Sequence, residues 1–141
     1  MINQILMASA GAIGFGAIFG LPRKKLHIVG VFEMFAWSIY LLLVKLLRDN
    51  GTAMFVITII IVLISKLMTH RLKCPTFIIA TPVLIPFIPG ATLYLVMSDF
   101  VANRDTLMIN LELLLEQAGA IIAGNLVAEM LYREQNRSSR G

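Results

Sequence analysis

The stretch that decides the fold is residues 74–94, CPTFIIATPVLIPFIPGATLY. It carries no charged side chain, so it suits the interior of a lipid bilayer. Three of its prolines, Pro82, Pro86 and Pro89, fall at positions i, i+4 and i+7. A proline inside a helix has no N–H to offer the carbonyl four residues earlier. We therefore predict a membrane-embedded helix that is interrupted between residues 82 and 90.

The interruption is expected to leave backbone groups available to a solute. The carbonyls of Ile78, Pro82 and Ile85 lose their usual donors. A helix that restarts near Gly90 presents unpaired N–H groups at its N-terminus. Irregular backbone at membrane depth is tolerated where it is buried in protein or lines a water-filled cavity, and broken helices build the binding sites of many transporters. The alternative is a proline-kinked helix that its neighbours satisfy and that binds no ligand.

The predicted binding residues combine the backbone of the interruption with nearby hydroxyl groups. A zwitterionic or dicarboxylic solute would be held mostly by backbone, and the hydroxyls would add hydrogen bonds. The candidate substrate-binding residues are Thr81, Pro82, Pro86, Pro89, Gly90, Thr92 and Tyr94.

The composition of the whole chain supports a membrane location. Of its 141 residues, 58% are apolar and 14% are charged, against about 45–50% and about 25% in an average soluble domain. The mean hydropathy is +0.84. These values argue against an ordinary soluble enzyme, a disordered segment and a free-standing nucleic-acid binder. The single cysteine, Cys74, allows no internal disulfide and no cysteine-built metal site.

Five apolar stretches approach the roughly 20 residues that a membrane-crossing helix needs. We therefore expect an all-α polytopic membrane protein, with one transmembrane domain over residues 1–132 and a polar cytoplasmic tail over residues 133–141. The expected spans cover residues 2–21, 26–47, 51–68, 74–98 and 106–132, and prolines break the fourth.

The basic residues predict the orientation, because lysine and arginine are enriched in short cytoplasmic loops. With five spans, nine basic residues fall on the side of the first and third loops and the C-terminus, and three fall on the other side. The nine are Arg23, Lys24, Lys25, Lys66, Arg71, Lys73, Arg133, Arg137 and Arg140. We expect a cell-membrane protein with its N-terminus outside and its C-terminus in the cytoplasm. The basic clusters then serve topology and lipid headgroups rather than nucleic acid.

Two glutamates inside the expected spans are candidates for proton coupling. An ionisable group at membrane depth costs about 2.5–3.5 kcal/mol on insertion scales, so it usually faces a cavity or a partner. Glu33 lies on one stripe with Trp37 and Tyr40, and Glu116 shares a face with Gly119. The alternatives are a hydrogen-bonded glutamate at a helix contact for Glu33 and a solvated helix end for Glu116.

Other polar residues have simpler expected roles. Lys66 can reach the headgroups with its long side chain, and Asn125 is expected to form a hydrogen bond between helices. The sequence carries no catalytic motif, no phosphate-binding glycine loop and no pair of metal-ligand histidines. We therefore expect no enzymatic activity, no metal and no cofactor.

The interrupted segment resembles that of a known family. Pro75, the run Pro86–Gly90 and Tyr94 are similar to the Pro-x-x-Pro-Gly-x-x-x-Tyr stretch of the threonine/serine exporter family. The length, without a soluble domain, is similar to that of the family's small subunit. The resemblance covers the layout of the whole chain and is specific at residues 86–94. It implies a multi-pass inner-membrane protein that exports threonine, serine or, in some members, a dicarboxylate such as succinate.

The resemblance also implies a partner, a larger membrane subunit with a related helical bundle and an N-terminal cytoplasmic domain. The mechanism would be alternating access, with the interruption forming part of a shared site near the midplane. The expected partners are thus this subunit, the lipid bilayer and a small-molecule substrate. Two alternatives stay open: a structural or assembly subunit without its own substrate site, and a homo-oligomeric channel.

Overall fold

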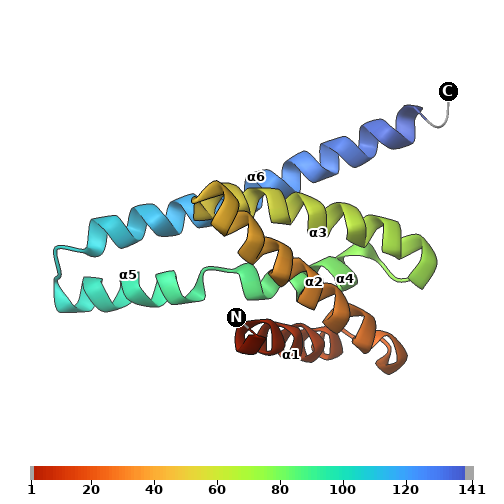
Figure 1. The fold of residues 1–141 in the computed structure, drawn as a ribbon, viewed down its shortest axis with the longest axis horizontal. Coiled ribbons are helices and arrows are strands. Elements are labelled where there is room, and N and C mark those ends of the chain that lie inside the picture. Colours follow the sequence, from red (N-terminus) through yellow and green to blue (C-terminus); the bar gives the residue numbers. More distant parts are fainter. Residues whose placement is uncertain (1, 139–141) are drawn as a thin grey trace.

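The computed structural model describes residues 2–138 as helices joined by short turns (Figure 1). In chain order they are α1 (Ile2–Ile18), α2 (Arg23–Leu47), α3 (Asn50–Leu72), α4 (Thr76–Leu84), the 3-10 helix η1 (Ile85–Phe87), α5 (Gly90–Ala102) and α6 (Leu107–Ser138). Within these residues there is no strand, which confirms the all-α prediction. Residues 139–141 of the expected tail, with Arg140, lie outside the described part of the chain, as does the side chain of Arg137.

The helix lengths agree with a polytopic membrane protein. The three helices α2, α3 and α6 are long and apolar enough to cross a bilayer. The segment 76–102 would be a fourth span, although its two halves are bent by 48°. The first expected span, 2–21, is only a 17-residue helix, because the chain turns at Gly20, where φ is +78°, and Pro22 follows.

The long helices end in a common way. The C-cap residues that follow α2, α3 and α5 are Arg48, Lys73 and Asn103, and each of them adopts the left-handed conformation. Positive charge near a helix C-terminus interacts favourably with the helix dipole, which suits Arg48 and Lys73. Asn103 belongs to a residue type that tolerates positive φ. The turns after α2, α3 and α5 are therefore short and well defined.

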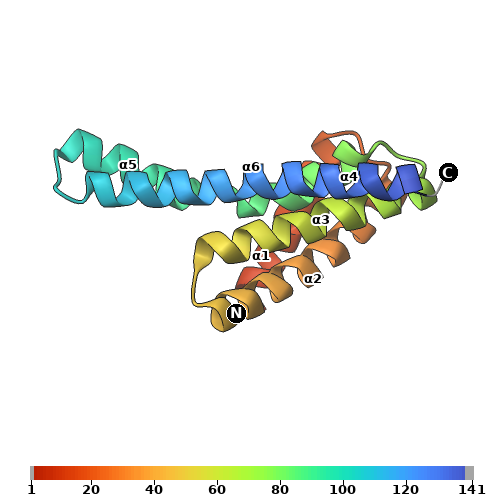
Figure 2. The same ribbon diagram turned by 90° about the horizontal axis from the view of Figure 1, so that it is seen from above.

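The helices form a bundle with a protruding hairpin, as two perpendicular views show (Figures 1 and 2). α3 packs against α6, α4 and α2, while α1 packs mainly against α2. α5 packs chiefly against α6. Together α5 and the first half of α6 extend well beyond the turn that joins α2 to α3.

Small residues allow the helix axes to approach closely. At Gly30 of α2 an added Cβ would lie 2.6 Å from the Ile13 side chain of α1, and the Ser9 hydroxyl donates a hydrogen bond of 3.0 Å to the Gly30 carbonyl. At Gly124 of α6 an added Cβ would lie 2.8 Å from the backbone oxygen of Phe55 in α3. The α3–α6 contact therefore depends on glycine, whereas an added Cβ at Gly30 would meet the Ile13 side chain, which can move.

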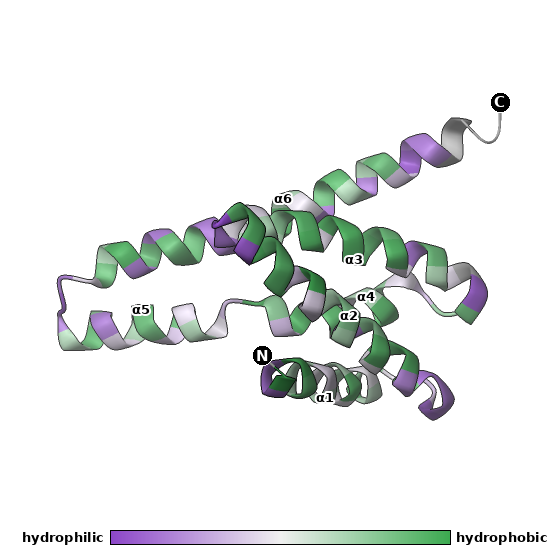
Figure 3. Ribbon diagram, viewed as in Figure 1, coloured by the Kyte–Doolittle hydropathy of each residue, from purple (hydrophilic) through white to green (hydrophobic). Residues whose placement is uncertain are grey.

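The basic segments gather at one end of the molecule. The α1–α2 turn, the α3–α4 turn and the C-terminal end of α6 all lie at the right of Figures 1 and 2. Hydrophilic residues concentrate there and at the other turns, and hydrophobic residues fill the helix bodies (Figure 3). The Lys25 ammonium ties two of the basic turns together, because it donates to the Leu72 carbonyl and lies 3.4 Å from the Cys74 sulfur.

Candidate functional site

The predicted interruption is present and is narrower than expected. α4 continues through Pro82 to Leu84, η1 follows, and the chain leaves helical geometry at Ile88 and Pro89 before α5 begins. A single proline is tolerated because it removes one helical hydrogen bond. Pro86 and Pro89 together remove two within one turn. The break therefore covers residues 85–89 rather than 82–90.

The backbone at the break is partly rebonded. The Ile85 carbonyl accepts a hydrogen bond of 3.0 Å from the Ile88 N–H, so the expectation that this carbonyl is free was wrong. The tight 3-10 turn supplies that nearer donor. The Gly90 N–H donates to Ile88, and the first bond of α5 runs from the Leu93 N–H. Within the described residues no backbone bond engages the N–H of Ala91.

A polar cleft of about 240 Å³ lies beside the break, between α4 and α6 and over α3. It reaches from Thr76, near the basic end, to Leu84, just before the break. Its lining residues are Val62 and Lys66 of α3, Thr76, Phe77, Ala80, Thr81 and Leu84 of α4, and Asn125 and Glu129 of α6. More than half of them are polar or charged, which is unusual in a chain this apolar.

An ion pair lies at one side of the cleft. The Lys66 ammonium is 2.5 Å from a Glu129 carboxylate oxygen, and the side chains are 11% and 42% exposed, respectively. The same ammonium lies 4.5 Å from the centre of the Tyr132 ring, a cation–π distance. Arg133 approaches the other Glu129 oxygen at 3.3 Å from a largely exposed position. Lys66 is thus anchored, and Glu129 is the more accessible member of the pair.

Two polar groups in the cleft have no hydrogen bond to the described part of the chain. They are the Thr81 hydroxyl and the Asn125 carboxamide, whereas the Thr76 hydroxyl lies 2.9 Å from that of Thr69. Asn125 is exposed, so the predicted inter-helix hydrogen bond is not formed among the described residues. The cleft therefore combines both signs of charge with unengaged polar groups.

The opposite face of α4 belongs to the core. Ile79, Pro82 and Val83 are buried there. Next to this face an aromatic cluster joins α2 to the break: the Phe87 ring lies 5.1 Å from Trp37 and 5.4 Å from Tyr40, measured between ring centres. The cleft and the aromatic cluster thus flank one short, proline-containing segment.

Glu33 is buried without a hydrogen-bond partner. It is fully shielded, and neither carboxyl oxygen bonds to any group in residues 2–138. The indole N–H of Trp37, one turn along α2, is also unpaired there, as is the buried hydroxyl of Ser65 on α3. Buried polar groups are usually satisfied, so unpaired ones call for a functional explanation or an unseen partner. This geometry keeps Glu33 a candidate for proton coupling.

The predicted binding residues do not form one cluster. Thr81 lines the cleft, Pro82 faces the core, and Pro86 is half-buried in η1. Pro89 and Gly90 lie at the break, and space is open around Gly90. Two residues of α5 behave differently from each other. The Thr92 hydroxyl is buried and donates a hydrogen bond of 2.8 Å to Gln117 of α6, whereas Tyr94 is 72% exposed.

Glu116 lies in a second, shallower groove between α3 and α6. Its exposed side chain lies directly over Gly51, beside Asp49, the N-cap of α3. Hydrogen bonds from Thr52 lower the pKa of Asp49 below its ordinary value. The groove measures about 320 Å³ and includes Gly119. Its charged groups are acidic, so it lacks the paired charges of the cleft.

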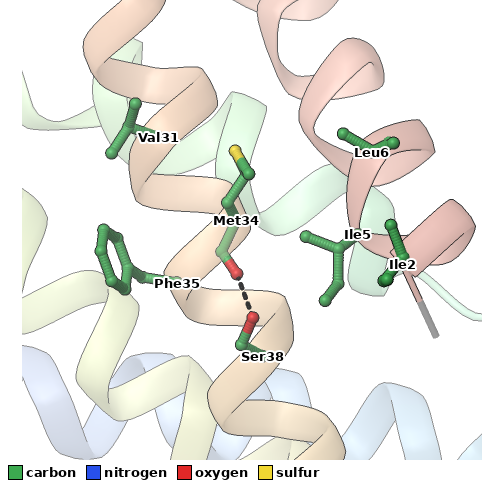
Figure 4. Close-up of a pocket in the computed structure, with 7 residues that line it drawn as sticks. All are labelled: Ile2, Ile5, Leu6, Val31, Met34, Phe35 and Ser38. Atoms are coloured by element: carbon green, nitrogen blue, oxygen red, sulfur yellow. Dashed lines mark hydrogen bonds between the residues drawn. The ribbon is translucent and has the colours of Figure 1, made fainter.

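A third groove lies between α1 and α2 and is almost wholly apolar (Figure 4). Its residues are Ile2, Ile5, Leu6, Val31, Met34, Phe35 and Ser38. The one hydroxyl, from Ser38, already donates to the Met34 carbonyl at 2.7 Å. This groove offers nothing to a charged or zwitterionic solute. No group of three or more metal-ligating side chains occurs in the described part of the chain.

The Lys66–Glu129 pair is the feature that sequence reasoning missed. Its members lie 63 positions apart, and Lys66 was assigned to the headgroups. The available signal was one acidic and one basic residue within two predicted spans, since charges inside a membrane protein tend to pair.

Comparison with known families gives one match. The family model described as "Threonine/Serine exporter, ThrE" matches residues 4–131. The match includes the break, the cleft and most of α6. No curated protein and no solved structure is similar enough to the chain to add to this finding.

Proposed function

The chain belongs to the threonine/serine exporter family, whose activity is membrane transport, and from this we propose that it is the small subunit of a two-component exporter. The solute would be threonine, serine or a dicarboxylate such as succinate. The observation that carries the proposal is the break at residues 85–89 beside a polar cleft. Broken helices flanked by polar cavities are a recurring design of transporter sites.

The polar cleft supports the need for a partner. It lies on the surface of this chain, between α4 and α6. Facing hydrocarbon, its charged and polar groups would be costly, so in the membrane they face water or protein. A larger subunit of the same family would cover the cleft and complete the binding site. Alternating access would then expose the shared site to each side in turn.

The basic end supports an orientation. Arg23, Lys24 and Lys25, then Arg71 and Lys73, lie at the same end of the bundle as the C-terminal part of α6. By the positive-inside rule this end faces the cytoplasm. The cleft begins near that end, so a solute leaving the cell would reach the cleft before the break.

The two glutamates have different settings for coupling. Glu33 is buried beside the aromatic cluster that contacts the break. A carboxyl group there could take up and release a proton as the site opens to each side. Glu116 is exposed in the second, shallower groove between α3 and α6 and would attract protons or cations. Glu33 is therefore the stronger candidate.

Efflux of labelled threonine, serine and succinate tests the proposal. The assay would use membrane vesicles that contain the full chain and its larger partner. We expect Thr81→Val, Pro89→Ala and Gly90→Leu to reduce flux, and Gly14→Leu to leave it unchanged. Gly14 is the matched control for Gly90, because an added Cβ meets nothing within 4 Å at either position.

The outcomes separate the alternatives. If none of the break and cleft variants alters flux while the protein stays folded, the assigned site is wrong. If a photoreactive solute labels only the partner, the chain is a structural subunit. If liposomes with this chain alone conduct solute, it forms a homo-oligomeric channel.

A further inference from the structure

We propose that the Lys66–Glu129 ion pair recognises the zwitterionic backbone of an α-amino acid. The solute's carboxylate takes the place of Glu129 at the Lys66 ammonium, and the solute's ammonium binds the released Glu129 carboxylate. This inference rests on the proposed transport function and assigns its first binding site within this chain.

The exposure of the two partners suits such an exchange. Lys66 is 11% exposed, and the Tyr132 ring holds its ammonium in place. Glu129 is 42% exposed and lines the cleft, one turn from Asn125. A carboxylate at the mouth of a cavity can turn away from a fixed ammonium without moving a helix. The pair can therefore open locally.

The charge balance favours a zwitterion over singly charged solutes. Opening the pair leaves one positive and one negative group, and an unpaired charge is strongly unfavourable at Lys66, the shielded member of the pair. A zwitterion satisfies both groups and forms two charge-assisted contacts for the one that is lost. A solute with only one charge pairs with Lys66 or with Glu129 but not with both, and a simple carboxylate leaves Glu129 with only the exposed Arg133 as its partner. The cleft therefore selects against amines and simple carboxylates.

The remaining cleft residues match a small hydroxylated side chain. The Thr81 hydroxyl and the Asn125 carboxamide line the same cavity and have no other hydrogen bond in the described chain. Either can bond to the hydroxyl of threonine or serine. The volume of about 240 Å³ lies below the roughly 300–1,000 Å³ of sites for drug-sized ligands. The cleft thus fits a solute of few atoms.

The test pairs protein variants with nearly isosteric solutes. Threonine amide lacks the carboxylate charge, and the hydroxy-acid analogue of threonine lacks the ammonium. Each would compete with labelled threonine for transport in vesicles that hold the full chain in its native membrane. We expect the unaltered protein to prefer threonine by about tenfold or more over either analogue, as charge-pair recognition does.

Each variant should lose one preference and keep the other. In Lys66→Gln the preference over threonine amide should disappear, while the preference over the hydroxy acid remains. In Glu129→Gln the pattern should reverse. Arg133→Gln is the matched control. Arg133 is the other cation near Glu129, but Arg133 itself does not line the cleft, so both preferences should persist. A preference is a ratio within one variant and does not depend on how much protein folds.

Two results would overturn the inference. One is a pair of variants that retain both preferences. The other is that both variants weaken the transport of threonine and the competition by both analogues by the same factor. That result is expected if the ion pair is purely structural. If the unaltered protein with its partner moves neither amino acid nor succinate, the proposed transport function fails; if it moves succinate alone, only the recognition of a zwitterion by this pair is refuted. Intact threonine transport with unaltered preferences refutes only the recognition by this pair.

Discussion

Replacing Gly124 with alanine should separate α3 from α6 and weaken the fold. Gly124 lies where α6 crosses the backbone of α3. An added Cβ would lie 2.8 Å from the Phe55 carbonyl oxygen and 3.0 Å from the Thr58 Cβ. Ordinary van der Waals contact begins at 3.4 Å, so the helices must separate locally by about 0.6 Å, the difference between 3.4 and 2.8 Å.

The magnitude follows from two opposing effects. Overpacking a well-packed interior costs about 1–3 kcal/mol. Alanine is favoured over glycine inside a helix by roughly 0.5–1 kcal/mol. The net loss of unfolding free energy for Gly124→Ala should therefore lie between about 0 and 2.5 kcal/mol. Gly119→Ala is the matched control, because it lies on the same helix and its Cβ would meet nothing within 4 Å.

The assay is reversible unfolding of the purified protein in mixed micelles. Far-ultraviolet circular dichroism would follow helix content as the fraction of denaturing detergent rises. The two variants share the gain in helix propensity, so the difference between them isolates the steric clash. We expect the free energy of unfolding of Gly119→Ala to exceed that of Gly124→Ala by about 1–3 kcal/mol. Equal stability of the two variants would refute the close α3–α6 approach.

Three further predictions use other contacts. Thr92→Val removes the hydrogen bond to buried Gln117 and should cost about 0.5–2 kcal/mol in the same unfolding assay; an unchanged stability would contradict that bond. Glu33→Gln keeps the shape of the side chain and removes its ionisable group at a buried, unpaired position, so the protein should stay folded by circular dichroism while proton-driven flux falls; normal coupled flux would remove Glu33 from the mechanism. Asp49→Asn tests the α3 cap, since the pKa of Asp49 is lowered from 3.8 by bonds from Thr52. The charged carboxylate therefore stabilises the fold above pH 3.8, and this contribution is lost as the pH falls through the lowered pKa; thermal melting should show the variant less stable than the unaltered protein at pH 7, with the gap closing in acid.

The helices and the break follow from local chemistry. Apolar runs bounded by Pro22, Asp49 and Pro75 define helices because proline and an N-cap carboxylate start helices wherever they occur. Pro86 and Pro89 interrupt the fourth span because neither has an N–H for the carbonyl four residues earlier; the Ile88 N–H replaces one of these bonds, but only in a 3-10 turn. These features depend on residues a few positions apart, so they could be predicted without the structure.

The cleft could not be predicted, because it depends on which helices meet. In soluble proteins a polar face tells which side of a helix points outward. Here most helices are apolar all round, so their packing faces are hidden. The pairing of Lys66 with Glu129 and of Thr92 with Gln117 needs the α3–α6 and α5–α6 contacts. Periodicity carries no information on these long-range partners.

The proline break does not behave as a free hinge, because α6 runs past it without interruption. The 32 residues of α6 extend about 48 Å at 1.5 Å per residue, and it packs on both α3 and α5. Two hydrogen bonds fix α5 to α6: the Thr92 hydroxyl donates to Gln117, and the Asn110 amide donates to Asp99. These bonds are seven positions apart on both helices, so sliding α5 by one turn would break both at once. The stiffness of the broken span is thus set by a neighbouring helix that contains no proline.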